Sequence, residues 1–443
     1  MTAPARALRY HFSGIAGAGV NPLARLVRAR GHRVQGSDRS FDQGKNTAVA
    51  DALRRLGIEV VPQDGAAVTP DIDRFVYSTA VEDDTPEMRA ARDAGVERVP
   101  RPALLAELVD AGAPGVAISG TSGKSTVTGM VAWLARESRR PATVIGGAAL
   151  VGDSGGLLVT GPAGGSLVAE ACESDGTLTG YHPSIGIVHN ISRDHAEMAS
   201  LRAQFSSFAR QCGRVFVNLD CPEAAALGRD LGASGYRIDG SGLAVLPGLT
   251  LALRVPQPGR HNLENAAAAA LVALEIGVGA GAVPALLSRF PGVARRFELI
   301  GTTPAGIRVV DDYAHNGAKL AAAIAAAQSG ADRVLAVFQP HGFGPARFLR
   351  PELRELLPRI LRPQDRFCYA EIYYAGGTIA RDLSSRDLAA DLPFALGCAY
   401  AADHRAVVSW ARSEARPGDT VLLMGARDPE LPQLARAVFT ALT

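Results

Sequence analysis

Short runs of valine, isoleucine and leucine alternate along the chain with stretches rich in alanine, arginine, leucine and glutamate. The short runs are typical of strands buried on both faces, and the stretches between them place apolar residues at helical spacing. Strands that alternate with helices form parallel sheets covered by crossover helices, so the sequence predicts the α/β class. We expect helices near residues 21–30 and 102–109, and strands near residues 8–12, 116–119, 167–170, 185–188, 309, 334–338, 367–372 and 421–424, with two more ending at Asp38 and before Tyr77.

The chain of 443 residues exceeds what one hydrophobic core usually serves. At roughly 100 to 200 residues per domain, this length predicts two to four domains, and we expect three. Two turn-rich segments, residues 110–115 and 301–306, mark the boundaries. We therefore predict domains at residues 1–112, 113–298 and 299–443.

The 46 basic and 44 acidic side chains nearly cancel and leave a net charge of +2, so no overall field favours nucleic acid or an anionic membrane surface. No stretch approaches about 18 uninterrupted apolar residues, and the first residues do not read as a secretory signal. We expect a cytoplasmic monomer or homodimer that acts on small molecules. The cysteines are odd in number and lack C-x-x-C spacing, which favours reduced packing thiols over disulfides or a zinc site: Cys172, Cys212, Cys221, Cys368 and Cys398.

A glycine-rich loop at residues 120–126 lies where a predicted strand becomes a helix. Glycines let backbone N–H groups converge on phosphate oxygens, and the N-terminus of the helix adds positive potential. Lys124 would reach the β- and γ-phosphates, and Ser125 would ligate magnesium. Ile118 replaces the first glycine of the usual pattern, and a turn with an exposed lysine is the alternative. The loop predicts ATP binding by Gly120, Thr121, Ser122, Gly123, Lys124, Ser125 and Thr126.

An earlier glycine loop, with Gly14, Gly17 and Gly19, also follows a strand and opens a helix. Asp38 ends the next strand about twenty residues later, a spacing that suits a pyrophosphate and a ribose. Pro22 stands where a dinucleotide motif has its third glycine, which weakens a nicotinamide-dinucleotide interpretation. Tight helix packing without a ligand is the alternative.

Two strands that follow the phosphate loop lead into polar residues. Residues 167–170 end in Glu170, and residues 185–188 lead towards His195. On neighbouring parallel strands these side chains would lie at the sheet edge that also holds Ser125, and magnesium that bridges nucleotide phosphates needs few protein ligands. We predict that Ser125, Glu170 and His195 ligate magnesium. A solvated carboxylate at Glu170 and a helix cap at His195 are the alternatives.

Several ordered segments resemble the Mur ligases, and the similarity covers essentially the whole chain. Beside the phosphate loop they are residues 168–177, 189–195, 259–269, 294–298 and 309–315. Three N-terminal segments, residues 11–20, 36–38 and 77–80, resemble the branches of the family that act on UDP-N-acetylmuramate. The resemblance implies a Rossmann-like N-terminal domain for a UDP-sugar, a central P-loop ATPase domain with a parallel sheet, and a Rossmann-like C-terminal domain.

The resemblance also implies roles for individual residues. Lys124, Glu170 and His195 would form the catalytic centre, and Asn262, Asn265, Arg296 and Asp312 would contact ATP. UDP-sugar contacts would come from Gly14, Gly17, Gly19, Ser37, Asp38 and Ser78, and amino acid contacts from Tyr313, His315, His341 and Arg347. The alternatives are that the two asparagines only cap a helix and that Arg296 forms a surface ion pair.

The implied reaction is ATP-dependent amide-bond formation in peptidoglycan biosynthesis. A carboxylate is a poor acylating agent, so the γ-phosphoryl group of ATP is first transferred to it, and an amine then displaces phosphate. The acid would be UDP-N-acetylmuramate, the amine an amino acid with L-alanine as the first choice, and the cofactors ATP and Mg²⁺. A different amine or nucleotide-linked acid, and a non-catalytic nucleotide-binding homologue, are the alternatives; an oxidoreductase would not need the second phosphate loop.

The third domain departs from the family pattern where the amino acid is expected to bind. In the family, a histidine followed by two arginines binds the carboxylate of the incoming amino acid. His341 is kept, but Gly342 and Pro345 replace the arginines, and Arg347 lies two residues late. Bidentate guanidinium contacts are geometrically demanding, so Arg347 would serve only if the glycine-rich loop folds back. A solvent-facing arginine at the start of a helix near residues 351–357 is the alternative.

Overall fold

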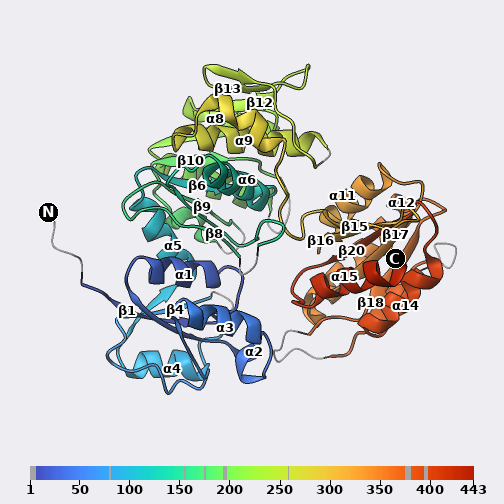
Figure 1. Cartoon of the computed structure of the whole chain (residues 1–443), viewed down its shortest axis with the longest axis horizontal. Helices are drawn as coiled ribbons and strands as arrows, with labels where there is room; N and C mark the ends of the chain where they lie inside the picture. The colour runs from blue at the N-terminus through green and yellow to red at the C-terminus, as the bar shows by residue number, and fades with distance from the viewer. Residues whose placement is uncertain are drawn as a thin grey trace. The chain divides into compact units, whose positions relative to one another are not determined.

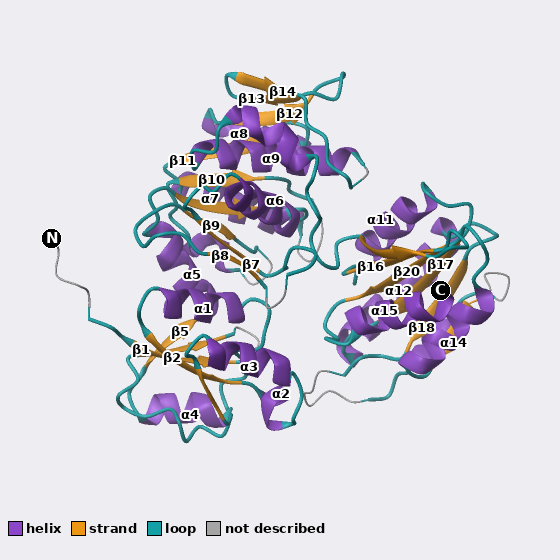
Figure 2. Cartoon of the chain, viewed as in Figure 1, coloured by secondary structure: helices purple, strands orange, loops and turns teal. Residues whose placement is uncertain are grey.

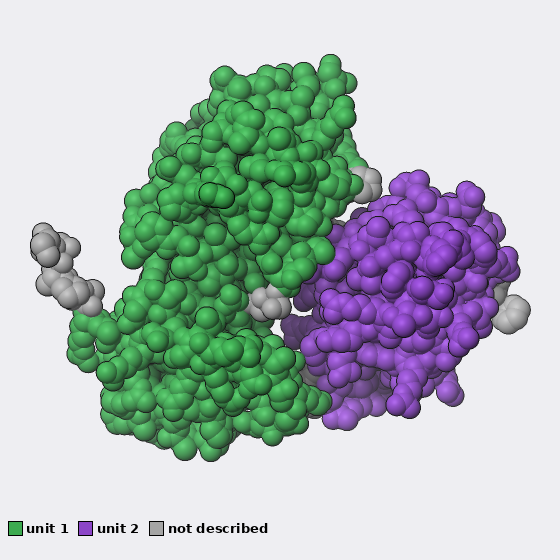
Figure 3. Space-filling model, in the orientation of Figure 1, with its two compact units in different colours: residues 1–293 green, residues 294–443 purple. Residues whose placement is uncertain are grey.

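The structure is a computed structural model that describes residues 6–78, 81–153, 156–173, 176–192, 197–257, 259–374, 381–393 and 398–443. The chain divides into two compact units, Met1–Val293 and Ala294–Thr443, which Figure 3 shows in different colours. Strands and helices alternate through both units (Figure 2), and the described strands form sheets of five, nine and six strands. The predicted α/β class is confirmed. Within these ranges, no helix has the length and apolarity that crossing a membrane requires.

The first sheet of unit 1 has five strands, and all neighbouring pairs are parallel. Its segment of the chain comprises β1 (Arg9–Ser13), α1 (Asn21–Ala29), β2 (Arg33–Ser37), α2 (Arg39–Asp42), α3 (Thr47–Arg55), β3 (Glu59–Val61), β4 (Arg74–Tyr77), α4 (Pro86–Asp93), β5 (Glu97–Pro100) and α5 (Arg101–Asp110). The strand order is β3-β2-β1-β4-β5, so the order reverses at β1, the strand that leads into the first glycine loop. Pro22 lies in the first turn of α1, where a missing N–H costs no helical hydrogen bond.

The second sheet of unit 1 has nine strands. Its segment comprises β6 (Gly115–Ser119), α6 (Lys124–Glu137), β7 (Thr143–Gly146), β8 (Leu157–Val159), β9 (Leu167–Glu170), η1 (Thr177–Gly180), β10 (Ile185–Val188), α7 (Met198–Gln211), β11 (Arg214–Asn218), α8 (Pro222–Leu231), β12 (Ser234–Ile238), β13 (Ala244–Leu246), β14 (Leu249–Leu251), α9 (Arg260–Glu275), η2 (Ala280–Ala282) and α10 (Val283–Leu287). The order is β14-β13-β12-β11-β10-β6-β9-β7-β8, with β8, β13 and β14 antiparallel to their neighbours. Strand β6 therefore runs through the centre and leads into the phosphate loop.

Helix α5 joins the two sheets of unit 1 into one core (Figure 1). It packs against β4 and β5 of the first sheet and against β6 and β9 of the second. Leu104 and Val109 of this helix are buried in a cluster that contains Tyr10 from the first sheet and Leu167 from the second. Because apolar side chains of both sheets share this core, the two sheets belong to one compact unit, which ends at Val293. The domain boundaries at residues 112 and 298 stay predictions.

Unit 2 contains a six-stranded sheet in the order β15-β16-β20-β17-β18-β19, parallel except for β15. Its elements are β15 (Glu298–Thr302), β16 (Arg308–Asp312), α11 (Gly317–Gln328), β17 (Val334–Gln339), α12 (Phe343–Ile360), β18 (Arg366–Ala370), α13 (Ser385–Ala390), β19 (Cys398–Ala401), α14 (His404–Glu414), β20 (Thr420–Gly425) and α15 (Leu431–Leu442). Separate apolar clusters cover the two faces of this sheet. Successive residues of β17 point to opposite faces, so Ala336 and Phe338 belong to one cluster and Leu335 and Val337 to the other. The last strand of the chain, β20, is inserted between β16 and β17.

Two details differ from the expected organisation. Glu170 and His195 were placed on neighbouring strands, but β6 lies between β9 and β10 and pairs with both. Gly301 and Thr302 were expected in a linker, yet they complete β15, which pairs with β16. Strand β15 is an edge strand in which Ile300 packs on the core while Leu299 is exposed. Because its second half belongs to the turn-rich segment 301–306, the sequence did not indicate a strand there.

Candidate functional site

The phosphate-binding loop joins β6 to α6. Gly120 and Gly123 have φ angles of 147° and 81°, which lie in the region that favours glycine. Helix α6 begins directly after Gly123, and the first N–H groups of a helix have no partner within it. Lys124 and Ser125 therefore occupy the first turn of a helix, at the strand-to-helix junction that was predicted. The N-terminus of a helix is of the kind that can bind phosphate.

Asn190, just after β10, holds this loop in shape. Its side-chain Oδ1 accepts hydrogen bonds from the Ser122 N–H at 2.8 Å and the Thr121 hydroxyl at 3.0 Å, and its Nδ2 donates to the Ser122 carbonyl at 3.1 Å. The Thr121 N–H also donates to the Asn190 carbonyl at 3.1 Å. The loop is thus preorganised by the neighbouring strand, a role that sequence analysis did not assign to Asn190.

Lys124 is buried and paired with an acid that the sequence analysis did not select. Its ammonium donates to Glu173 Oε2 at 2.7 Å and to the Gly120 carbonyl at 2.5 Å, and Glu173 is 2% exposed. Burial lowers the pKa of Lys124, but the carboxylates of Glu173 and Glu170 more than offset it, and the net shift is upward. Lys124 is therefore held as a cation inside the loop. The available signal was an acid three residues after Glu170 in the same segment.

Ser125 and Glu170 come together as predicted for a magnesium site. The Ser125 hydroxyl, in the first turn of α6, donates at 3.0 Å to Oε1 of Glu170, the last residue of β9. Both groups are oxygen donors of the kind magnesium prefers, so they fit a partial ligand set that phosphate oxygens and water would complete. His195 lies outside the described residues. Within the described ranges, no three His, Cys, Asp or Glu side chains gather in a metal-binding arrangement.

His189, which directly follows β10, packs against Gly123 of the phosphate loop. It is buried, its Nδ1 lies 2.7 Å from the Tyr236 hydroxyl oxygen, and the two rings stack at 6.1 Å. Its ring is also hydrogen-bonded to Asn265, and burial lowers the pKa of His189 to about 4, so the ring is neutral. Asn265 in turn donates to Asn262 Oδ1 at 3.2 Å. Asn265 is only 4% exposed, so it braces Gly123 from inside the protein.

We expect Gly123→Ala to lower ATP-dependent phosphate release about 100-fold, the usual effect of a displacement near 1 Å at a reacting centre. A Cβ atom there would lie 2.5 Å from Asn265 Oδ1 and 2.9 Å from His189 Cδ2, on a backbone that disfavours side chains. Gly279→Ala is the matched control, because its Cβ would meet no atom within 4 Å. Steady-state phosphate release checks the prediction, and equal rates in both variants would contradict it.

The residues predicted to bind a UDP-sugar lie mostly at one edge of the first sheet. Gly14 follows β1 and adopts φ of 75°, and Gly17 and Gly19 lie on the turn that leads into α1. Ser78 directly follows β4, the parallel neighbour of β1. The carboxyl ends of adjacent parallel strands form the crevice in which such folds bind nucleotides, so this arrangement fits the prediction.

Ser37 and Asp38 hold the loop instead of facing the crevice freely. Asp38 Oδ2 accepts a hydrogen bond from the Ala16 N–H at 3.0 Å, and its other oxygen caps α2. Ser37 is fully buried, and its hydroxyl donates to Glu87 at 2.5 Å. Glu87 also binds His11 at 2.8 Å, within a buried polar cluster that sequence analysis did not predict. A side-chain contact between Ser37 and a UDP-sugar does not fit this geometry.

In unit 2, Asp312 shapes the loop that carries the next predicted residues. Its two oxygens accept hydrogen bonds from the Phe297 N–H at 2.7 Å and the Ala314 N–H at 2.8 Å, and burial raises the pKa of Asp312. The guanidinium of Arg296 lies 5.1 Å from the ring centroid of Tyr313. Asp312 and Arg296 are thus both engaged in ordering the end of β16.

Arg295, which sequence analysis passed over in favour of Arg296, links two strands. It pairs with Asp311 at 3.1 Å and donates to the carbonyls of Gly425 at 2.6 Å and Ala426 at 2.9 Å. Burial raises the pKa of Asp311 to about 6 despite this partner. Arg295 therefore joins the carboxyl ends of β16 and β20.

Tyr313, His315 and His341, all three assigned to the amino acid site in the sequence analysis, form a cluster at the carboxyl edge of the six-stranded sheet. The ring centroids of Tyr313 and His315 lie 5.6 Å apart, and those of His315 and His341 lie 5.7 Å apart. His315 Nδ1 lies 2.9 Å from the Tyr313 carbonyl, and it must be the donor because a carbonyl only accepts. Burial, with smaller effects of His315 and Arg427, lowers the pKa of His341 to about 4, so His341 is neutral.

Arg347 does not join this cluster. Helix α12 begins at Phe343, eight residues earlier than expected, so the segment that was to fold back is helical. Arg347 lies on the exposed face of this helix and pairs with Asp382. Among the contacts of the described residues, none joins Arg347 to Tyr313, His315 or His341. The expectation of a flexible loop failed because a helix N-terminus formed directly after Gly342.

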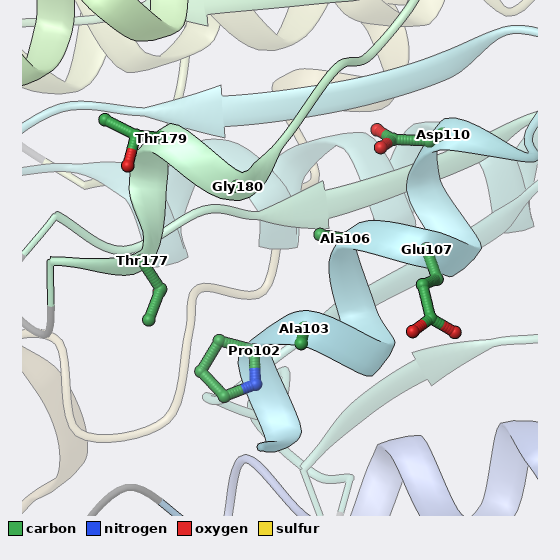
Figure 4. Close-up of a pocket in the computed structure, with 8 residues that line it drawn as sticks. All are labelled: Pro102, Ala103, Ala106, Glu107, Asp110, Thr177, Thr179 and Gly180. Atoms are coloured by element: carbon green, nitrogen blue, oxygen red, sulfur yellow. The ribbon is translucent and has the colours of Figure 1, made fainter. Parts of the chain in front are cut away.

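A separate hollow of about 400 Å³ lies between α5 and η1 (Figure 4). Its two acids are already engaged: Glu107 binds Arg74 at 2.7 Å, and Asp110 accepts from the His182 N–H at 2.9 Å. None of the predicted site residues lines it. We therefore assign it no role in the chemistry.

Two family models match the chain. "Mur ligase family, catalytic domain" matches residues 9–112, and "Mur ligase, glutamate ligase domain" matches residues 295–427. Among solved structures, UDP-N-acetylmuramate-alanine ligase from Thermotoga maritima is similar with a TM-score of 0.75 and 23% identity over 98% of both chains. A murein peptide ligase from Psychrobacter arcticus is similar with a TM-score of 0.68 and 21% identity over 98% of this chain and 99% of that one. These likenesses establish the three-part fold.

Curated relatives extend the similarity to the sequence level. UDP-N-acetylmuramate--L-alanine ligase of Kineococcus radiotolerans is 34% identical over 96% of this chain and 94% of its own length. The protein of the same name from a Nocardioides species is 35% identical over 94% of this chain and 93% of its own length. With the ordered phosphate loop, the Ser125–Glu170 pair and the histidine cluster, these matches lead to one conclusion: the chain belongs to the Mur ligase family of ATP-dependent ligases.

Proposed function

We propose that the protein joins the amino group of L-alanine to the carboxylate of UDP-N-acetylmuramate and converts ATP to ADP and phosphate. The observation that carries the proposal is the preorganised phosphate loop, with charged Lys124 in its interior and the Ser125–Glu170 pair beside it. Relatives that bear this activity in their names are similar along almost the whole chain, which supports the choice of substrates.

The chemistry follows from charge. Transfer of the γ-phosphoryl group to the sugar carboxylate places negative charge on the phosphoryl oxygens, which Lys124 and the N–H groups at the start of α6 stabilise. Lys124 must then exchange Glu173 for phosphate. The carboxylates beside it raise the pKa of Lys124 in the structure, so the lysine is a cation before the exchange. The amine attacks the acyl phosphate, and phosphate leaves. Neutral His341 and the His315 ring would lie near the acceptor amine, and we assign the general base to neither.

We propose that Ser125 and Glu170 hold Mg²⁺ and that His195 contributes a third ligand. When bound, the ion neutralises charge on the transferring phosphates. Ser125 and Glu170 orient their oxygens through the 3.0 Å hydrogen bond between them.

The proposal also includes the domain boundaries at residues 112 and 298, the cytoplasmic location and the monomeric or dimeric state.

Phosphate release with UDP-N-acetylmuramate and a panel of amino acids and short peptides tests the function. We expect turnover with L-alanine that requires ATP, magnesium and the UDP-sugar together. Mass spectrometry of the nucleotide product identifies the new amide. Release of phosphate without formation of a UDP-linked amide would contradict the proposal. So would the absence of phosphate release with every member of the panel.

A different amino acid acceptor is the second candidate, because one observation favours it. Gly342 and Pro345 occupy the places in which a carboxylate-binding pair of arginines is expected, and Arg347 points to Asp382. The same panel distinguishes the two candidates, since turnover with another amino acid at a higher kcat/KM than L-alanine selects the second.

A further inference from the structure

The carboxyl edge of the six-stranded sheet brings His341 and Arg427 onto adjacent loops. Strands β17 and β20 are parallel neighbours, and the last pair in their register is Gln339 with Gly425. His341 and Arg427 each lie two residues beyond this pair. Ligands of open parallel sheets bind in the crevice outside the carboxyl ends of the strands, so both residues face the region in which an acceptor is expected.

Arg427 is exposed and differs from several other arginines of unit 2. Arg295 is paired with Asp311, Arg347 with Asp382 and Arg350 with Asp391. No hydrogen bond or ion pair of the Arg427 side chain occurs among the contacts of the described residues. Its charge is nevertheless felt by His341, whose pKa it helps to lower. Arg427 is therefore a cation available for a ligand beside His341.

The acid next in sequence does not neutralise Arg427. Asp428 is buried, its Oδ2 lies 3.2 Å from His404 Nε2, and its Oδ1 accepts a hydrogen bond from the Glu430 N–H at 2.8 Å. Asp428 thus binds towards α14 and the start of α15, while the exposed Arg427 retains its donors. An unpaired guanidinium with a planar set of donors matches the geometry of a carboxylate.

We propose that Arg427 binds the carboxylate of the incoming amino acid beside His341 and thereby sets the preference for acceptors with a free α-carboxylate. This inference rests on the proposed function, but only on its requirement for an amino acid and not on alanine as that amino acid. It assigns the task to the loop after β20, because the loop after β17 carries Gly342 and Pro345 and turns Arg347 away.

The test compares each acceptor with its carboxamide, for example L-alanine with L-alaninamide, in the full-length enzyme. We expect the wild type to prefer the acid, and Arg427→Ala to raise the KM of the acid about 10- to 100-fold, as for loss of a hydrogen bond to a charged group. The KM of the amide and those of ATP and the UDP-sugar should change less than about twofold by the same reasoning. Arg427→Lys should restore part of the preference, because it keeps the charge and loses the planar fork.

Arg436→Ala is the matched control, since Arg436 is an exposed arginine on α15 of the same unit, and it should leave every KM unchanged. Arg347→Ala is the competing variant. The proposal is overturned if Arg427→Ala leaves the ratio of the KM of the acid to that of the amide unchanged. It is also overturned if only Arg347→Ala abolishes the preference for the acid. If L-alanine fails but another amino acid is used, the function as stated fails, and the same comparison with that amino acid decides the role of Arg427. A wild type that uses amides as well as acids overturns it too.

Discussion

Lys124→Ala should abolish amide-bond formation, with kcat lowered at least about 10³-fold, the upper range for loss of one transition-state donor. The affinity for UDP-N-acetylmuramate should remain nearly unchanged, because the predicted UDP-sugar residues lie at the edge of the first sheet, whereas Lys124 begins the helix that follows β6 of the second. Steady-state phosphate release and calorimetric titration of the UDP-sugar measure the two quantities separately. Equal loss of both would count against the domain assignment.

A second variant separates chemistry from stability. Lys124→Ala leaves Glu173 buried without its cation, and breaking a buried pair costs about 3–5 kcal/mol. The double variant with Lys124→Met and Glu173→Gln removes both charges and should fold better than Lys124→Ala, yet it should be equally inactive. Lys45→Ala, at an exposed position, is the control with expected wild-type turnover. Turnover by a well-folded double variant would remove Lys124 from the phosphate site.

Glu170→Gln should raise the magnesium concentration for half-maximal turnover by at least about 10- to 100-fold, the range for residues that only support metal ligands. The amide keeps the size of the side chain and can still bind the Ser125 hydroxyl, so the change removes mainly the negative charge. Magnesium titrations at saturating ATP provide the measurement. We expect His195→Ala to act in the same direction.

Glu223→Gln serves as the control for the magnesium titrations, because Glu223 pairs with Arg202 at 2.6 Å on an exposed surface. It should show the magnesium dependence of the wild type. If Glu170→Gln and His195→Ala also show it, neither residue ligates the metal, and Glu170 is then a strand-end acid that holds Ser125.

The phosphate loop could be predicted because its shape depends on a few contiguous residues. Glycines at 120 and 123, a lysine and a serine at a strand-to-helix junction dictate a local backbone shape whatever the rest of the chain does. The strands ending at Glu170 and near Val188 were equally visible, since runs buried on both faces need no partner to be recognised. Their positions on either side of β6 were not visible, because sequence does not state the order of strands in a sheet.

The sequence by itself determined the α/β class and the glycine-rich loop between β6 and α6, because each depends on local periodicity or on a few adjacent residues. The magnesium ligands Ser125, Glu170 and His195 stay a prediction. Only the tertiary structure decided which distant groups share a buried environment: Glu173 with Lys124, His189 with Tyr236, and Ser37 with Glu87. Buried polar groups must find partners, but many partners satisfy that need, and the chain path selects among them. In the same way, insertion of β20 between β16 and β17 placed the loop of Arg427 next to that of His341. Because α12 begins already at Phe343, Arg347 lies on a helix and does not join the histidine cluster.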